Sequence, residues 1–305
     1  MKSPHIRLGA VAALVALALA AATSTTHAAT RPIVAVGAEN EYADVIAQIG
    51  GKDVATTAIM SNPNVDPHSF EASPSVARTV SAAQLVVQNG LGYDAFMNKI
   101  ESASPGSHRR VIDVQSLLGL PDSTSNPHLW YSPATMPAVA KAIAAALSAL
   151  RPGDAPTFAA NLRRFDASLR PWRRAIASLR SRFGGAPVAT TEPVADDLLE
   201  AAGLDDLTPF PLQADIMNGL DPSPQAITYQ QSLFTHHEVR AFVVNEQVTD
   251  SITESFVALA RKNRIPVVAV YETMPAPGYH YQSWMLAEVA ALRNALAHGR
   301  SAVKL

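Results

Sequence analysis

Residues 33–59 read IVAVGAENEYADVIAQIGGKDVATTAI and contain the pattern that decides the fold. A short β-branched run, Ile33–Val36, is followed by Tyr42–Ile49, where apolar residues recur at helical spacing, and then by a second such run, Ala55–Ile59. Short strands that alternate with helices are typical of parallel sheets whose faces are covered by helices. The stretch therefore predicts an α/β fold built from β–α–β units.

The same alternation continues along the rest of the chain. Further strands are expected at Leu85–Gln88, Val111–Val114, Pro187–Thr190, Phe242–Asn245 and Val267–Tyr271, and further helices at Ser75–Ala83, Tyr93–Glu101, Pro133–Leu150, Val194–Ala202, Gln225–His236, Thr249–Asn263 and Trp284–Ala297. Ser132 is expected to cap the helix that begins at Pro133. The pattern predicts two similar lobes, each a mainly parallel sheet flanked by helices, at residues 29–152 and 185–305.

One long helix is predicted between the lobes, over residues 153–184. Its apolar residues alternate by four and three positions and form a single stripe of Phe158, Leu162, Phe165, Leu169, Trp172, Ile176 and Leu179. Because proline removes an intrahelical hydrogen bond and clashes with the preceding turn, Pro171 is expected to kink this helix. The linking helix should leave a cleft between the two lobes.

The N-terminus has the features of a secretory signal peptide. Lys2 and Arg7 precede an apolar run from Leu8 to Ala22, which is short for a membrane span. Thr26-His27-Ala28 has small residues at the two positions that define a cleavage site. We expect a signal peptide over residues 1–28, cleavage after Ala28 and a periplasmic mature protein.

Composition narrows the classes of function. The chain has no cysteine, which excludes disulfides, thiolate metal sites and lipid attachment at the cleavage site. Its 24 basic and 26 acidic residues give a formal net charge of −2, so that nothing indicates a nucleic-acid-binding protein. Apolar residues are plentiful at 48%, which argues against a disordered chain.

Four residues that can bind a metal follow predicted strands. His68 comes after the second strand and His128 after the fourth, whereas Glu192 and Glu272 end the first and last strands of the second lobe. Ligands of open parallel sheets bind at the carboxyl ends of the strands, so two facing lobes would bring two imidazoles and two carboxylates together across a crevice. Each residue alone could equally be an ordinary surface side chain, and the hypothesis of a metal site depends on all four.

Several motifs around these residues carry a family resemblance. The most specific are Asp66-Pro67-His68, Asn89-Gly90-Leu91-Gly92-Tyr93, Asn126-Pro127-His128-Leu129-Trp130, Ala201-Ala202-Gly203-Leu204, Ile265-Pro266-Val267-Val268 and Tyr271-Glu272-Thr273. In their order and spacing the chain resembles the metal-binding solute-binding proteins of ABC importers for zinc, manganese and iron, whose lobes are joined by a single long helix. The resemblance covers essentially the whole mature chain.

The resemblance implies a ligand set and a partner. His68 and His128 would be the metal ligands of the first lobe, and Glu192 and Glu272 those of the second. They would hold one divalent transition-metal ion, Zn²⁺ or Mn²⁺ and possibly Fe²⁺, as the transported ligand. The protein would be a monomer that delivers this ion to an ABC permease and its ATPase at the inner membrane.

Two departures from the family pattern bear on the choice of metal. Zinc-dedicated members usually have a third histidine at the position of Glu192, and often a histidine-rich loop before the second ligand, whereas residues 114–126 are short here and contain no histidine. Manganese and iron members typically have an aspartate where this chain has Glu272. Two oxygens and two nitrogens shift the preference toward manganese or iron without excluding zinc.

Other polar residues near strand or helix ends remain alternatives. His280 and Glu246 are the next candidates for a ligand if one of the four is wrong. Asn245-Glu246-Gln247 ends a strand of the second lobe, where support of the ligands and packing between the lobes are both open, with packing favoured. The pair His236-His237 is expected at the end of a helix, where positive charge is favourable.

Two other classes of function compete with a transport protein. A metal-dependent hydrolase can also hold zinc with two histidines and a carboxylate, but the sequence has no His-Glu-x-x-His helix and no Gly-x-Ser-x-Gly turn. An adhesin of the same fold is the other alternative, although no separate adhesive module is present. We therefore expect a binding protein rather than an enzyme.

Overall fold

The computed structural model describes residues 1, 31–106, 108–275 and 278–305. Apart from Met1, the predicted signal peptide and its cleavage site lie outside the described residues. Within the described part, no helix has both the length and the apolar character needed to cross a membrane. Residues 32–305 pack as one unit that contains both of the sheets.

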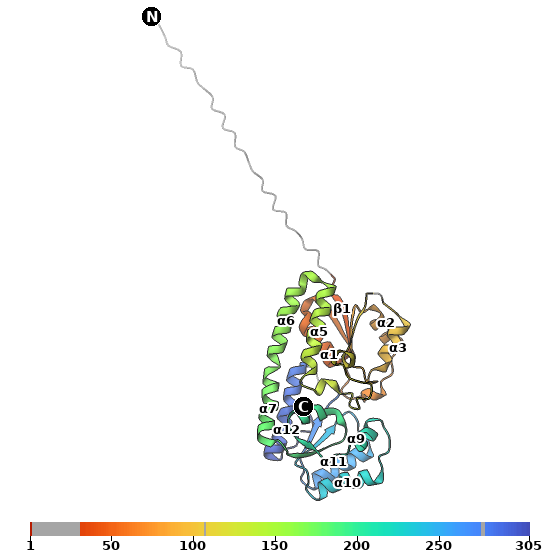
Figure 1. Cartoon of the computed structure of the whole chain (residues 1–305), viewed down its shortest axis with the longest axis vertical. Coiled ribbons are helices and arrows are strands. Elements are labelled where there is room, and N and C mark those ends of the chain that lie inside the picture. The colour runs from red at the N-terminus through yellow and green to blue at the C-terminus, as the bar shows by residue number, and fades with distance from the viewer. Residues whose placement is uncertain (2–30, 107, 276–277) are drawn as a thin grey trace. The chain divides into compact units, whose positions relative to one another are not determined.

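The first sheet has four parallel strands in the order β2-β1-β3-β4, and its strand β1 is labelled in Figure 1. Its elements are β1 (Ile33–Glu39), α1 (Asn40–Gly50), β2 (Val54–Met60), α2 (Pro74–Ala82), β3 (Leu85–Gln88), α3 (Ala95–Ala103), β4 (Arg110–Asp113), α4 (Val114–Leu118) and α5 (Thr135–Leu150). Leu85 and Val87 of β3 face the core that includes α1 and α5, and Val86 faces a second core with α2 and α3. Helices on both faces explain why the strand is apolar throughout.

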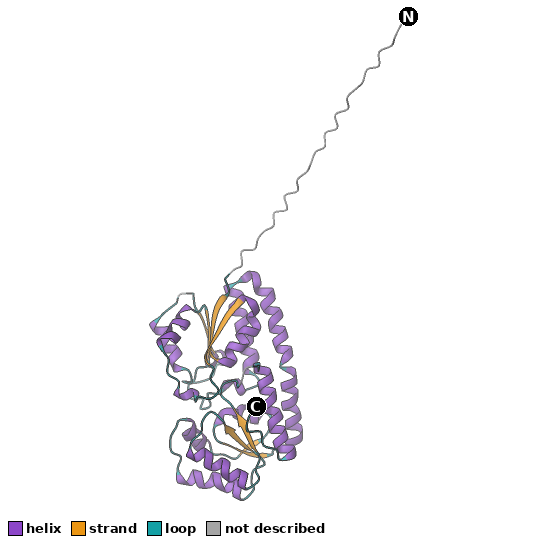
Figure 2. Cartoon of the chain, turned by 180° about the vertical axis from the view of Figure 1, so that it is seen from behind, coloured by secondary structure: helices purple, strands orange, loops and turns teal. Residues whose placement is uncertain are grey.

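The second sheet repeats this arrangement with the order β6-β5-β7-β8. Its elements are β5 (Pro187–Thr190), α8 (Asp196–Ala201), β6 (Asp205–Asp206), α9 (Phe210–Met217), α10 (Pro224–Thr235), β7 (Phe242–Asn245), α11 (Ser251–Lys262), β8 (Val267–Val270) and α12 (Tyr281–His298). Figure 2 shows the two groups of strands, each flanked by helices. In both sheets the second strand along the chain is an edge strand that pairs with the first. The shared strand order confirms the predicted fold class of two similar α/β lobes.

Two helices in line, α6 (Ala155–Ser168) and α7 (Arg170–Phe183), run along one side of the molecule past both sheets (Figure 1). The predicted stripe is buried except for Leu162, which is partly buried. The helix is interrupted at Leu169, two residues before Pro171, whose missing N–H leaves one carbonyl of the preceding turn without its helical partner. Because α6 packs on α5 and α1, and α7 packs on α12, the pair braces both lobes.

The predicted elements differ from the structure at a few places. Strand β6 and helix α4 were not predicted, since neither has enough residues to show a clear period, and helix α9 was not predicted either. Ser132 does not cap α5: that helix begins at Thr135, after Ala134, and no side chain caps it. The reason is that Leu129–Tyr131 form a buried 3-10 turn, which delays the start of the helix.

Candidate metal centre

Both candidate histidines follow a turn that a side chain closes. Oδ1 of Asp66 accepts a hydrogen bond from the backbone N–H of His68 (2.8 Å), and Oδ1 of Asn126 accepts one from the N–H of His128 (3.0 Å). In each turn a proline separates the two residues and restricts the backbone. These two Asx-Pro-His turns fix the positions from which the imidazoles project.

The ring of His128 is held in one orientation and one tautomer. Its Nδ1 lies 2.8 Å from Oδ1 of Asn126. Because an amide oxygen only accepts, this contact places a hydrogen on Nδ1, so that Nε2 has a lone pair for a metal whenever the ring is neutral. The ring is fully buried and makes edge contacts with Trp130 (5.5 Å between centroids) and Tyr93 (5.8 Å).

The structure brings His68, His128 and Glu272 together from the two lobes. Nε2 of His68 lies 3.2 Å from Oε2 of Glu272, and Nε2 of His128 lies 3.3 Å from the same oxygen. The three ligand atoms all fall within 4.8 Å of one another. A tetrahedral zinc ion with bonds of about 2.0–2.1 Å needs ligand atoms about 3.3–3.4 Å apart, so these separations already suit a metal.

The electrostatics of the group centre on Glu272. Burial alone would raise the pKa of this carboxyl, but the imidazoles of His128 and His68 beside it outweigh burial and lower its pKa below the ordinary range. Burial lowers the pKa of the fully buried His128, whereas the carboxylate of Glu272 overcomes burial at His68 and raises that pKa. Glu272 is therefore an ionised acceptor between two imidazoles.

Glu192 lies beside this group rather than within it. Nδ2 of Asn245 donates to Oε2 of Glu192 (3.1 Å) and to Oε1 of Glu272 (2.6 Å), so that one amide joins the two carboxyls. Glu192 is buried, and its Oε1 has no hydrogen-bond partner within the described residues. Burial, followed by the charge of Glu272, raises the pKa of Glu192 well above its ordinary value. The ligand atoms of three of the four predicted residues thus lie close together, and the fourth residue, Glu192, is connected to Glu272 through the side chain of Asn245.

Three residues support the segment of Glu272: Tyr93 and Tyr131 had no role assigned from the sequence, and for Gln247 both support of the ligands and packing were open. The hydroxyl of Tyr93 donates to Oε2 of Glu272 (2.9 Å), and Gln247 accepts from the backbone N–H of Glu272 (2.7 Å). The hydroxyl of Tyr131, three residues after His128, lies 2.7 Å from the carbonyl oxygen of Tyr271. Tyr93 and Tyr131 are part of, or adjoin, the sequence motifs, but only their contacts across the lobes show what they do.

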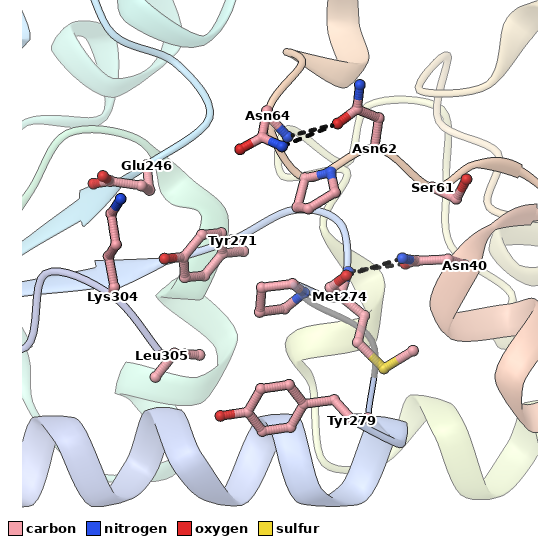
Figure 3. Close-up of a pocket in the computed structure, with 13 residues that line it drawn as sticks. Asn40, Ser61, Asn62, Asn64, Glu246, Tyr271, Met274, Tyr279, Lys304 and Leu305 are labelled. Carbon is pink, nitrogen blue, oxygen red and sulfur yellow. Dashed lines mark hydrogen bonds between the residues drawn. The ribbon is translucent and has the colours of Figure 1, made fainter.

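The alternative ligands lie elsewhere. Nδ1 of His280 is 2.7 Å from Oδ1 of Asp44, on the exposed side of the N-terminus of α12. Glu246 lines a cavity together with Lys304 (Figure 3). His236 occupies the predicted place at the C-terminal end of α10. Neither His280 nor Glu246 belongs to the group formed by His68, His128 and Glu272.

A protein family matches nearly the whole described chain. The family described as zinc-uptake complex component A, periplasmic (ZnuA), matches residues 36–295, which include both sheets and the linking helices. The chain belongs to the ZnuA family. The resemblance to metal-binding solute-binding proteins of ABC importers is thereby confirmed.

Individual relatives of this ZnuA-family chain are more distant. The zinc-binding protein TroA of Treponema pallidum is 28% identical over 161 residues, which are 47% of this chain and 52% of TroA. The manganese-binding lipoprotein MntA of Bacillus subtilis is 27% identical over 136 residues, which are 43% of this chain and 44% of MntA. Across the curated relatives the matched region spans 33% to 63% of their own length.

A solved structure shares the fold. The crystal structure of a ZnuA aligns with a TM-score of 0.71 and 19% identity, over 87% of this chain and 100% of that one. At this identity the likeness concerns the fold alone.

Proposed function

We propose that this chain is a periplasmic metal-capturing protein of an ABC importer. It would bind one divalent transition-metal ion between two lobes, at residues 29–152 and 185–305, which the segment 153–184 with helices α6 and α7 joins. The observation that carries the proposal is the convergence of His68, His128 and Glu272 from different lobes, with the carboxylate oxygen 3.2 and 3.3 Å from the two imidazole nitrogens. Membership of the ZnuA family supports it.

The chemistry of the donor set suits a transition metal. Nε2 of His68 and Oε1 of Glu192 are buried without an aligned hydrogen-bond partner within the described residues, so each is free to act as a ligand. Glu192 would be the fourth ligand after its carboxyl turns toward the other three. Two imidazoles and two carboxylates suit Zn²⁺, Mn²⁺ or Fe²⁺, and the relatives named for zinc and for manganese support the same range.

The arrangement favours capture and release over catalysis. Catalytic zinc sites hold the metal with three protein ligands and keep an open position for water. Here the fourth candidate donor, Glu192, lies next to the group, and Tyr93 adds a hydroxyl on Glu272. The ion would be the cargo, and a permease with its ATPase would be the partner that receives it.

A competitive titration tests this function. The purified protein, stripped of metal, is titrated with Zn²⁺, Mn²⁺ and Fe²⁺ against a chelator of known affinity. We expect one ion per chain, loss of binding in His128→Ala and unchanged binding in His280→Ala, because His280 is exposed and outside the site. Weak binding by the wild-type protein, or an equal loss in the two variants, would contradict the proposal.

A further inference from the structure

Gln247, two residues beyond the end of β7, lies between the two segments that carry His68 and Glu272. Its Oε1 accepts from the backbone N–H groups of Glu272 (2.7 Å) and Thr273 (2.8 Å). Its Nε2 donates to the carbonyl oxygen of Val65 in the other lobe (3.0 Å) and to Oγ1 of Thr273 (3.0 Å). One buried carboxamide therefore contacts the backbone of both ligand-bearing segments.

The loop of residues 61–66, which leads to His68, has little other support. Within the described part of the chain, its remaining side-chain and turn hydrogen bonds stay among residues 62–69. A cavity of about 910 Å³ borders residues 61–64 (Figure 3), and one of about 230 Å³ borders residues 65–67. The bond from Gln247 to Val65 is thus what ties this loop to the second lobe in the described structure.

The segment that carries Glu272 is anchored to the first lobe by another side chain. Asn40, at the start of α1, donates from Nδ2 to the carbonyl oxygen of Met274 (3.0 Å) and accepts at Oδ1 from its N–H (2.8 Å) (Figure 3). Met274 lies only two residues beyond Glu272. Without the side chain of Gln247, the Glu272 segment keeps its hydrogen bonds to Asn40, whereas the loop that leads to His68 loses its hydrogen bond to the second lobe.

We infer that Gln247 is a positioning residue that holds His68 at its distance from Glu272 and thereby sets how fast the site releases its metal. The inference rests on the proposed function, because it needs an ion bound by these two residues. Release requires a donor to move away from the ion. The side chain of His68 is 22% exposed, whereas those of His128 and Glu272 are fully buried, so His68 is the donor that can leave first.

Two variants of Gln247 and one control test the inference. Gln247→Met keeps the length of the side chain and removes its polar groups. Gln247→Asn keeps the carboxamide but is one methylene shorter, so that it cannot reach Val65 and Glu272 together. The control is Gln48→Ala: Gln48 also bonds across the lobes, to Gln282 (3.0 Å), but contacts no ligand-bearing segment.

Rates of metal release give the readout. The protein loaded with Mn²⁺ or Zn²⁺ is mixed rapidly with excess chelator, and the association rate and the unfolding temperature of the metal-free protein are measured alongside. The loss of one net hydrogen bond predicts release about threefold to tenfold faster in the Gln247 variants. The association rate should stay within about twofold of wild type, since interface changes act mainly on dissociation.

The outcomes separate a positioning role from a merely structural one. Faster release in the Gln247 variants with wild-type release in Gln48→Ala supports the inference, and Gln247→Asn alone carries the test if Gln247→Met does not fold. A lower unfolding temperature with wild-type release overturns it, as does an equal acceleration by Gln48→Ala. If the wild-type protein binds neither metal, the proposed function fails first and the inference fails with it.

Discussion

Replacing Glu192 by glutamine tests whether the fourth predicted ligand takes part in metal binding. The carboxyl is buried, with Oε1 unpartnered among the described residues and Oε2 accepting from Asn245 (3.1 Å). Glu192→Gln keeps the shape of the side chain and an oxygen that can accept from Asn245. The substitution therefore removes the carboxyl group that would lose its proton and bind the metal, while it disturbs the packing little.

The expected magnitude follows from the protonation of this carboxyl. Burial and then the charge of Glu272 raise the pKa of Glu192 well above its ordinary value, so the carboxyl keeps its proton to a higher pH than an ordinary glutamate, whose pKa is about 4.3. A metal ligand must be deprotonated, so metal binding would expel this proton. Glu192→Gln should then release fewer protons per ion at pH 6 than the wild-type protein does. Its affinity should fall by about 10-fold to 100-fold or more.

Calorimetry measures both quantities. Titrations with Zn²⁺ and Mn²⁺ at pH 6 in buffers of different ionisation enthalpy give the number of protons released from the slope of the binding enthalpy. Glu288→Gln is a matched control, because Glu288 is also buried with a raised pKa but contacts Tyr131 and Trp284 instead of the candidate ligands. If the proton count and the affinity of Glu192→Gln equal those of wild type, Glu192 is no ligand and the reasoning is refuted.

Three further predictions concern the same residues. His68→Ala and His128→Ala should each abolish tight metal binding in calorimetric titrations, and tight binding by either variant would remove that histidine from the site. Because the ring of His128 is fully buried, His128→Ala should also lower the free energy of unfolding by about 1–3 kcal/mol more than His68→Ala does. Glu192→His should keep zinc and lose most manganese affinity in competition against one chelator, since a borderline nitrogen replaces a hard oxygen; an unchanged preference would argue against direct ligation. Burial raises the pKa of Glu288 to about 8, so the folded metal-free protein holds a proton that the unfolded chain has lost, and its free energy of unfolding should fall by about 2.5 kcal/mol from pH 6 to pH 8.5. Thermal unfolding measured across this pH range should show no such fall for Glu288→Gln.

The parts of the fold that depend on local pattern could be predicted from the sequence. The strands Leu85–Gln88, Pro187–Thr190 and Phe242–Asn245 have the bounds that the apolar runs indicated, because fully buried parallel strands are apolar on both faces. The placement of ligands at the carboxyl ends of strands also follows from topology alone. The structure does bring His68 and His128 to one place, although the whole of α4 lies between the end of β4 and His128.

What depends on strand order and on contacts across the lobes could not be predicted. Nothing in the sequence shows that β7 lies between β5 and β8, so the position of Asn245 between Glu192 and Glu272 was invisible. The segment 245–247 was noted, but packing was favoured over support of the ligands. Taken alone, His128 could equally be a surface side chain, and its complete burial depends on contacts with Tyr93 and Trp130 that no periodic pattern in the sequence indicates.

The repeated topology explains how both lobes support their donors. In each sheet the third strand along the chain occupies the same place. An asparagine stands at the end of each of these strands: Asn89 is the first residue after β3, and Asn245 is the last residue of β7. Nδ2 of Asn89 donates to the carbonyl oxygen of Pro127 (2.8 Å), next to His128, just as Nδ2 of Asn245 joins the two glutamates. A carboxamide nitrogen only donates hydrogen bonds, so it can hold oxygens in place without competing for a metal. The same structural position therefore supplies a neutral support in both lobes, beside β4, which precedes the segment of His128, and beside β5 and β8, which lead to Glu192 and Glu272.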